Sequence, residues 1–192
     1  MCYPMIKGIL NYAHHLLEES VSKGETVIDA TCGNGNDTVF LSKTVGDEGR
    51  VLAFDIQRQA IQNTRQLVDE NNAQNVSLIN DSHAHTAKYL SDDLKGQVGG
   101  AIFNLGYLPK GDKAIITEGE STIAAIETIL MYLKKNGLIV IVVYHGHDGG
   151  KTEKEAILKH VIRLDQKAYN VLQYGFINQK NNPPFIIAIQ KK

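Results

Sequence analysis

The sequence has no tryptophan, only four prolines and only two cysteines among its 192 residues. The cysteines, Cys2 and Cys32, are too few for a disulfide framework and lack the paired spacing of a zinc site, so we expect neither structural disulfides nor a bound metal. The formal net charge is −1, which excludes attraction of nucleic acid by the whole molecule. Any RNA binding would need a local basic face.

Long hydrophobic runs are also missing. The longest strongly apolar run, Leu138–Tyr144, is far shorter than the roughly 20 residues of a membrane-spanning helix. The first residues lack the pattern of a secretory signal, and we expect a cytoplasmic protein without membrane contact. With 43% hydrophobic and 21% charged residues, the chain has the composition of one globular domain over 1–192.

What the sequence does contain is an alternation of strand-like and helical segments. Apolar residues at helical spacing predict an N-terminal helix over 5–22. Alternating strands and helices predict a mostly parallel sheet with helices on both faces, and a short proline-containing connection predicts an antiparallel last strand. Strands are expected at 26–30, 50–55, 76–79, 97–103, 138–143, 169–177 and 185–190, and further helices at about 37–44, 57–71, 84–94, 123–133 and 152–165.

The most informative segment is 27–38, VIDATCGNGNDT. A β-forming start leads to Asp29, a turn with Gly33 and Gly35 follows, and a helix is predicted to begin near Asp37. About 20 residues after this loop, a second apolar run ends in Asp55, where an acidic residue can accept hydrogen bonds from ribose hydroxyls. The pattern predicts a site for a cofactor that contains a nucleoside.

The loop chemistry favours one cofactor class over another. The dinucleotide fingerprint requires a third glycine, where this chain has Thr38, and Asp37 would repel a pyrophosphate. S-adenosylmethionine carries an ammonium and a sulfonium and no phosphate, so Asp29 and Asp37 suit it. The residues thus favour a methyltransferase over a dinucleotide enzyme, and a glycine turn without any ligand is the remaining alternative.

Polar residues also follow the third predicted strand, where ligands bind in parallel sheets. Asp81 or Ser82 could reach an adenine amino group, and His83 could stack or donate a hydrogen bond. The alternative is that Asp81 and Ser82 only cap the next helix, because both residue types are favoured at that position.

Asn104-Leu105-Gly106-Tyr107 after the fourth strand resembles the Asn-Pro-Pro-Tyr loop of amino-group methyltransferases, with Leu105 and Gly106 in place of the prolines. This resemblance implies that Asn104 accepts a hydrogen bond from the target amine, and Tyr107 can stack on a base. An ordinary loop is the alternative interpretation.

Histidines offer proton acceptors. His145 and His147 lie in a glycine-rich segment after the fifth strand, where they could take a proton from an amine near neutral pH, or could simply be exposed loop residues. A metal site is disfavoured because no third ligand has a recognised spacing. His14 and His15 on the first helix are expected at the core edge, unless that helix covers the site.

Together these segments resemble a family of small Rossmann-fold methyltransferases described as rRNA methylases, which includes bacterial tRNA 5-(aminomethyl)-2-thiouridine methyltransferases. The resemblance implies a class I methyltransferase fold with a seven-stranded sheet in the order 3-2-1-4-5-7-6. It also implies S-adenosylmethionine as cofactor, the anticodon stem-loop of tRNA as substrate and a homodimer. The segments that carry it are DATCGNGNDT, AFDIQ, DSH, FNLGYLPKGDK, YHGHDGG and NNPPF.

The resemblance also implies which residues contact the cofactor. Asp29 and Gly33 would shape the pocket, and Gly35 and Thr38 belong to the same loop. The substrate stays open at this point, because an rRNA or a small-molecule amine would suit the same residues. The cofactor contacts themselves would fall on Asn34, Asp37, Asp55, Gln57, Ser82 and His83.

Overall fold

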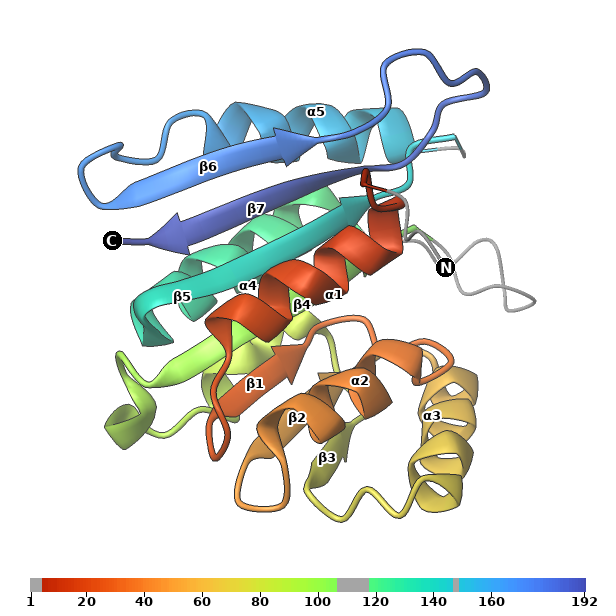
Figure 1. Ribbon diagram of the computed structural model, residues 1–192, viewed down its shortest axis with the longest axis vertical. Coiled ribbons are helices and arrows are strands. Elements are labelled where there is room, and N and C mark those ends of the chain that lie inside the picture. The colour runs from red at the N-terminus through yellow and green to blue at the C-terminus, as the bar shows by residue number, and fades with distance from the viewer. Residues whose placement is uncertain (1–4, 107–117, 147–148) are drawn as a thin grey trace.

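The computed structural model describes residues 5–106, 118–146 and 149–192. Its strands form one seven-stranded sheet in the order β3-β2-β1-β4-β5-β7-β6 (Figure 1). Strands β1 to β5 pair in parallel, and β7 lies antiparallel between β5 and β6. The predicted order and the antiparallel last strand are therefore confirmed. The strands are β1 Thr26–Asp29, β2 Arg50–Phe54, β3 Val76–Ile79, β4 Val98–Leu105, β5 Leu133–Val143, β6 Tyr169–Tyr174 and β7 Phe185–Lys191.

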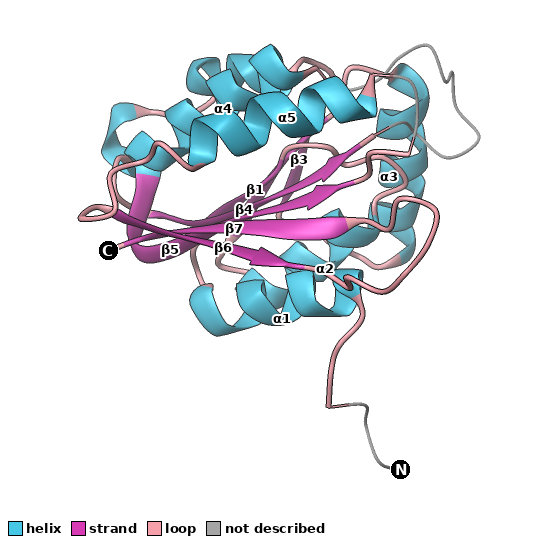
Figure 2. Ribbon diagram, turned by 90° about the horizontal axis from the view of Figure 1, so that it is seen from above, coloured by secondary structure: helices cyan, strands magenta, loops and turns pink. Residues whose placement is uncertain are grey.

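Helices cover both faces of the sheet. Figure 2 shows α4 and α5 on one side and α1 and α2 on the other. Helix α3 packs its Ile61 into the same apolar cluster as α1 and α2. The helices are α1 Ile9–Ser20, α2 Asn36–Val45, α3 Arg58–Glu70, α4 Gly119–Tyr132 and α5 Gly150–Val161. No helix in the described residues is long and apolar enough to cross a membrane.

Strand residues alternate between two hydrophobic clusters. In β2, Val51 and Ala53 face α1 and α2, whereas Leu52 and Phe54 face the α4 and α5 side. The same alternation continues through β5 and β7. A sheet that is buried on both faces needs apolar residues at successive positions, which explains the continuous apolar runs in the sequence.

Several elements differ from the sequence prediction. Helix α1 spans Ile9–Ser20 rather than 5–22, β5 begins at Leu133 rather than 138, and β6 ends at Tyr174 rather than 177.

Two further differences concern the residues after β3 and the end of β4. The helix expected over 84–94 is instead two short 3-10 helices, η1 His83–Lys88 and η2 Asp92–Leu94. The hydroxyl of Thr86 donates to the carbonyl of His83, so a side chain takes an acceptor that an α-helix would use. Strand β4 also continues beyond Phe103, because Asn104 and Leu105 still pair with β5. Asn104 is thus a strand residue rather than a loop residue.

Candidate functional site

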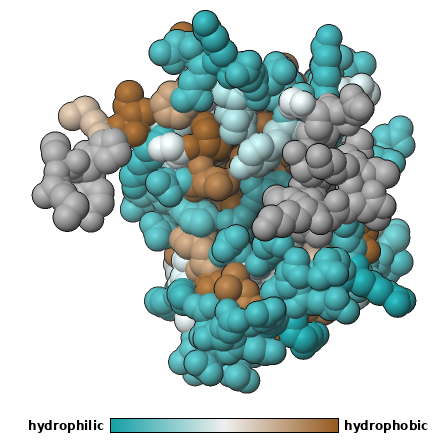
Figure 3. Space-filling view, turned by 90° about the vertical axis from the view of Figure 1, so that its right-hand side faces the viewer, coloured by the Kyte–Doolittle hydropathy of each residue, from teal (hydrophilic) through white to brown (hydrophobic). Residues whose placement is uncertain are grey.

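The polar residues singled out from the sequence gather at one edge of the sheet. The arrowheads of β1 and β5 point to the right in Figure 1, and Figure 3 views the molecule from that side. Hydrophilic residues predominate there, with hydrophobic patches between them. This edge carries the carboxyl ends of the parallel strands, where ligands bind in sheets of this kind.

The glycine loop between β1 and α2 is pressed against α3. Gly33 and Gly35 have positive φ angles of 52° and 87°, in the left-handed region that favours glycine. A Cβ atom on Gly35 would lie 3.0 Å from the Cα atom of Thr64. The hydroxyl of Thr64 also donates to the carbonyl of Gly33 at 3.1 Å. The loop therefore lies against helix α3. Position 35 requires glycine for two reasons: a side chain would collide with Thr64, and the backbone has a positive φ angle.

Asp29 is the last residue of β1 and is fully buried. The hydroxyl of Thr38 donates to its Oδ2 atom at 2.6 Å, and the backbone N–H of Thr31 donates to Oδ1 at 3.2 Å. Burial, reinforced by the negative charge of Asp37, raises the pKa of Asp29 to about 8. Within the described part of the chain, neither Asp29 nor Asp37 forms an ion pair with a lysine or arginine. The site therefore holds two neighbouring carboxyl groups that no lysine or arginine of the described residues neutralises.

Asp37 connects two further elements. Its Oδ1 atom lies 2.6 Å from Nε2 of His14 on α1, and its Oδ2 atom accepts a hydrogen bond from the side-chain amide of Asn104. The other end of that amide, Oδ1 of Asn104, is buried and has no hydrogen-bond partner among the described residues. An unpaired buried acceptor is costly, so the site offers a carbonyl oxygen that is suited to receive a donor from a ligand.

Asp55 follows β2 and binds the glycine loop. Its Oδ2 atom accepts from the N–H of Gly33 at 3.1 Å, and its Oδ1 atom accepts from the N–H of Gln57 at 2.9 Å. Burial raises the pKa of Asp55. Each carboxylate oxygen can accept more than one hydrogen bond, so both retain capacity for a ribose hydroxyl. Asn34 is exposed at the tip of the loop and accepts from the amide of Asn63 at 2.9 Å.

The residues after β3 have mainly structural partners. Ser82 caps η1 by accepting from the N–H of Ala84 at 3.2 Å. His83 is 7% exposed, and its Nδ1 atom lies 3.0 Å from the carbonyl oxygen of Ala30. Burial lowers the pKa of His83, which favours the neutral ring. The imidazole therefore joins η1 to the end of β1, and its Nε2 atom lies 3.5 Å from Oγ of Ser121 on α4.

Tyr144 directly follows β5 and interacts electrostatically with Asp37. Burial and the charge of Asp37 raise the pKa of Tyr144. His145, the next residue, packs its ring edge-to-face against Phe185 at the start of β7, with 5.6 Å between ring centroids. Tyr107 and His147, the other two expected catalytic residues, lie outside the described residues.

Three residues of the site make contacts that were not foreseen from the sequence. His14 was expected at the core edge, yet its ring reaches Asp37 and stacks on Phe40 with 3.8 Å between centroids and 5° between planes. Thr31 accepts the backbone N–H of Asn104 at 2.6 Å, and Thr64 supports the loop. The position of His14 beside an apolar helical stripe was the only sequence signal, while the two threonines had none.

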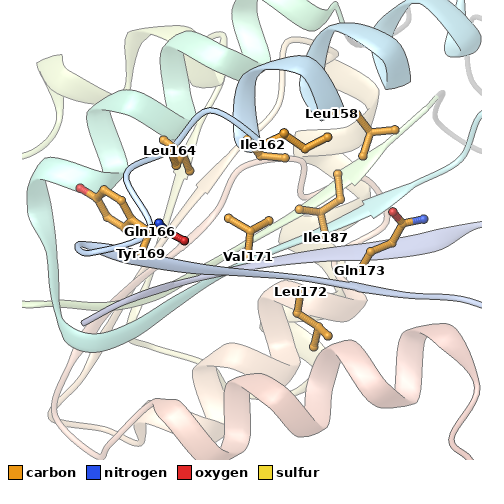
Figure 4. Close-up of a pocket in the computed structure, with 10 residues that line it drawn as sticks. Leu158, Ile162, Leu164, Gln166, Tyr169, Val171, Leu172, Gln173 and Ile187 are labelled. Carbon is orange, nitrogen blue, oxygen red and sulfur yellow. The ribbon is translucent and has the colours of Figure 1, made fainter.

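A cavity of about 340 Å³ lies elsewhere, between α5 and the edge strand β6. Figure 4 shows Val171 and Ile187 pointing from the strands toward Leu158 and Ile162, while Leu172 points to the other face. Its polar lining consists of Tyr169 and two glutamines, with no carboxylate, amine, imidazole or thiol, so it is a weaker candidate for a catalytic site than the strand ends. The described residues also contain no group of three or more His, Cys, Asp or Glu side chains that could hold a metal ion.

Comparison with known proteins identifies the family. The model of the family described as "Putative rRNA methylase" matches residues 51–190. This chain belongs to that family. The methylase is also 42% identical, over 97% of its length and 70% of the other protein, to "tRNA (mnm(5)s(2)U34)-methyltransferase, chloroplastic" of Arabidopsis thaliana. The expectation that the chain is a methyltransferase is confirmed.

Solved structures agree with this family. The methylase superposes on a putative rRNA-methylase from Clostridium thermocellum with a TM-score of 0.94 and 43% identity, covering 98% of this chain and 100% of that one. A putative methyltransferase from Streptococcus mutans, solved in complex with SAH, gives a TM-score of 0.88 and 42% identity, with coverage of 98% and 100%. An O-methyltransferase from Thermotoga maritima, at 14% identity and a TM-score of 0.65, shares the fold alone.

Proposed function

We propose that this methylase transfers a methyl group from S-adenosylmethionine to the primary amine of 5-aminomethyl-2-thiouridine at the wobble position of tRNA. The product is 5-methylaminomethyl-2-thiouridine. The observation that carries the proposal is the buried, unpaired Oδ1 atom of Asn104 at the end of β4, which suits an amine N–H. The modified nucleoside in the name of the Arabidopsis relative supports the choice of substrate.

The chemistry of the glycine loop fits the proposed cofactor. Asp37 provides negative charge for an ammonium and a sulfonium, as does Asp29 once it ionises on cofactor binding, and the turn at Gly33 and Gly35 leaves backbone free of side chains. When bound, the cofactor supplies a methyl group on positively charged sulfur. The SAH complex of the Streptococcus relative supports this assignment. The proposed contacts are Asp29, Gly33, Asn34, Gly35, Asp37, Thr38, Asp55, Gln57, Ser82 and His83.

The residues of the chain supply alignment. Asn104 accepts an N–H of the amine and so directs the nitrogen lone pair towards the methyl group, and such positioning accounts for much of the rate of a displacement reaction. The amine reacts in its neutral form, and the nitrogen carries one surplus proton once the new carbon–nitrogen bond has formed. His145 or His147 takes that proton, directly or through water.

The proposed substrate also suits the site physically. A base in the anticodon loop is partly unstacked, so presenting it costs less than extruding one from a duplex. Tyr107 is the proposed stacking partner for that base. We further propose that the anticodon stem-loop is the part of tRNA that is bound and that the methylase works as a homodimer.

The test uses purified protein, labelled S-adenosylmethionine and total tRNA from cells that lack the modification. Mass spectrometry of the digested nucleosides should then show 5-methylaminomethyl-2-thiouridine. Parallel reactions contain ribosomal RNA or the free aminomethyl nucleoside. Label in ribosomal RNA alone would replace the proposal with an rRNA methyltransferase, and methylation of the free nucleoside at an undiminished rate would indicate a small-molecule N-methyltransferase.

A further inference from the structure

Helix α1 precedes the glycine loop in the chain, yet it contributes a side chain to the site. Nε2 of His14 lies 2.6 Å from Oδ1 of Asp37, and the two side chains are only 28% and 14% exposed. The His14 ring lies flat on Phe40 of α2, which fixes the plane in which its N–H points. His15, its neighbour, turns instead towards Tyr12, with 6.2 Å between ring centroids.

Asp37 links His14 to Asn104 on β4, because each of its two carboxylate oxygens contacts one of these residues. A carboxylate can rotate about its Cβ–Cγ bond, and a hydrogen bond from His14 to Oδ1 opposes that rotation. The remaining oxygen, Oδ2, then stays in place to accept from the amide nitrogen of Asn104. The backbone of Asn104 is held separately, because its N–H donates to Thr31 at 2.6 Å.

The Asn104 amide has two ends with opposite chemistry. Its nitrogen is a donor and its oxygen is an acceptor, so a half-turn about the last side-chain bond would exchange them. With the nitrogen bound to Asp37, the oxygen is left on the other side, buried and without a partner among the described residues. A reversed amide would present a donor to the donor groups of an amine and would repel it.

We propose that His14 is a positioning residue for methyl transfer, because it fixes Asp37 and thereby sets the orientation of the Asn104 amide. This inference rests on the proposed function, in which Asn104 receives the target amine. His14 touches neither the amine nor the methyl group in this arrangement. It acts through two successive hydrogen bonds that join α1, α2 and β4.

Two substitutions separate the hydrogen bond from the stacking. His14→Phe keeps a ring on Phe40 and removes the donor, whereas His14→Gln keeps an N–H donor. His15→Phe is the matched control on the same helix. In single-turnover reactions with the aminomethylated tRNA, we expect His14→Phe to slow transfer at least about tenfold, with the cofactor Kd within about threefold of wild type. His14→Gln should recover most of the rate, and His15→Phe should equal wild type.

A double-mutant cycle tests whether His14 acts through Asn104. In the Asn104→Ala background, His14→Phe should slow transfer by less than about twofold, because the amide it orients is gone. Fully multiplicative losses would overturn the inference, as would a His14→Gln variant no better than His14→Phe.

A second measurement needs no substrate. Nitrogen-15 NMR reports the side-chain NH₂ of Asn104, assigned by its absence in Asn104→Ala. We expect His14→Phe to move this signal towards that of a freely solvated amide and His14→Gln to leave it near its wild-type position. An unmoved signal in His14→Phe would refute the inference. If wild-type protein fails to methylate any tRNA, the proposed function fails, and the NMR result still decides the role of His14.

Discussion

Thr38, in the first turn of α2, donates its hydroxyl to Asp29 at the end of β1, with 2.6 Å between the oxygen atoms. Only one residue before Thr38, Asp37 adds a second carboxylate whose charge acts on Asp29. Keeping two carboxyl groups where they are poorly solvated costs the free protein stability, and the raised pKa leaves Asp29 largely protonated near pH 7. This cost to the free protein becomes useful only when a positive ligand binds, and the first two predictions follow from it.

Asp29→Asn should flatten the dependence of stability on pH. The fold raises the pKa of Asp29 from 3.8, its value in the unfolded chain, to about 8. The stabilisation that comes from the protonated carboxyl is therefore complete below pH 3.8 and is lost as the pH rises through about 8. We expect the free energy of unfolding of the cofactor-free wild type to fall across this window, and that of Asp29→Asn to fall less. Urea denaturation at several pH values measures both, with the exposed Asp47→Asn as control. Identical slopes would contradict the assignment.

Cofactor binding should release protons near pH 7. A bound ammonium or sulfonium stabilises the ionised carboxylate of Asp29 and lowers the pKa that burial had raised. The binding enthalpy of S-adenosylmethionine should therefore change with the ionisation enthalpy of the buffer, and calorimetry in two buffers of equal pH gives the number of protons released. Asp29→Asn should release fewer. A binding enthalpy independent of buffer would show that Asp29 does not respond to the ligand.

Asn104→Ala should abolish most of the methyl transfer and leave cofactor binding intact. Loss of one preorganised polar contact to the reacting group costs on the order of 100-fold in rate. We expect a decrease of that size in single-turnover rates on aminomethylated tRNA, with the cofactor Kd within about threefold of wild type. Asn170→Ala, on the exposed edge strand β6, is the control and should keep the full rate. An unchanged rate in Asn104→Ala would remove Asn104 from the mechanism.

Gly35→Ala should destabilise the protein and weaken cofactor binding together. The φ angle of 87° places a non-glycine residue in the left-handed region, at a cost of about 1–2 kcal/mol, and the new Cβ atom would lie 3.0 Å from Cα of Thr64. Gly8→Ala is the matched control, because nothing lies within 4 Å of a Cβ atom there. Thermal and urea denaturation compare the two. Equal stability of both variants would contradict this prediction and would mean that α3 moves to accommodate the Cβ atom of alanine at position 35.

Most of the fold could be predicted because its signals are local. Successive apolar residues in segments such as 51–54 indicate a sheet buried on both faces, and the short connection before Phe185 indicates an antiparallel strand. The boundaries were less predictable. The end of β4 depends on pairing between Asn104 and Val142 of β5, and η1 depends on the Thr86 hydroxyl binding a carbonyl. The residues next to Asn104 and Thr86 in the sequence do not predict either interaction.

Some residues of the site could also be predicted from the sequence, and others could not. Asp29, Asp37 and Asp55 could be proposed from the sequence because strand ends and a glycine loop mark their positions. The partners of these acids could not. His14 meets Asp37 only because α1 docks on the same face as α2, and Thr64 meets the loop only because α3 packs beside it. Such contacts join residues 23 and 31 positions apart, beyond the reach of any local pattern.

Because Asn104 lies inside β4, the sheet itself fixes the proposed acceptor: the residue pairs with Val142 in the same ladder that forms the core. A residue anchored in this way stays in place when surrounding surface segments are exchanged. Relatives with this architecture can therefore diverge in what they recognise by changing residues outside the strands, while the oxygen that we propose to bind the amine keeps its location. Diversification of targets would then come at little cost to foldability.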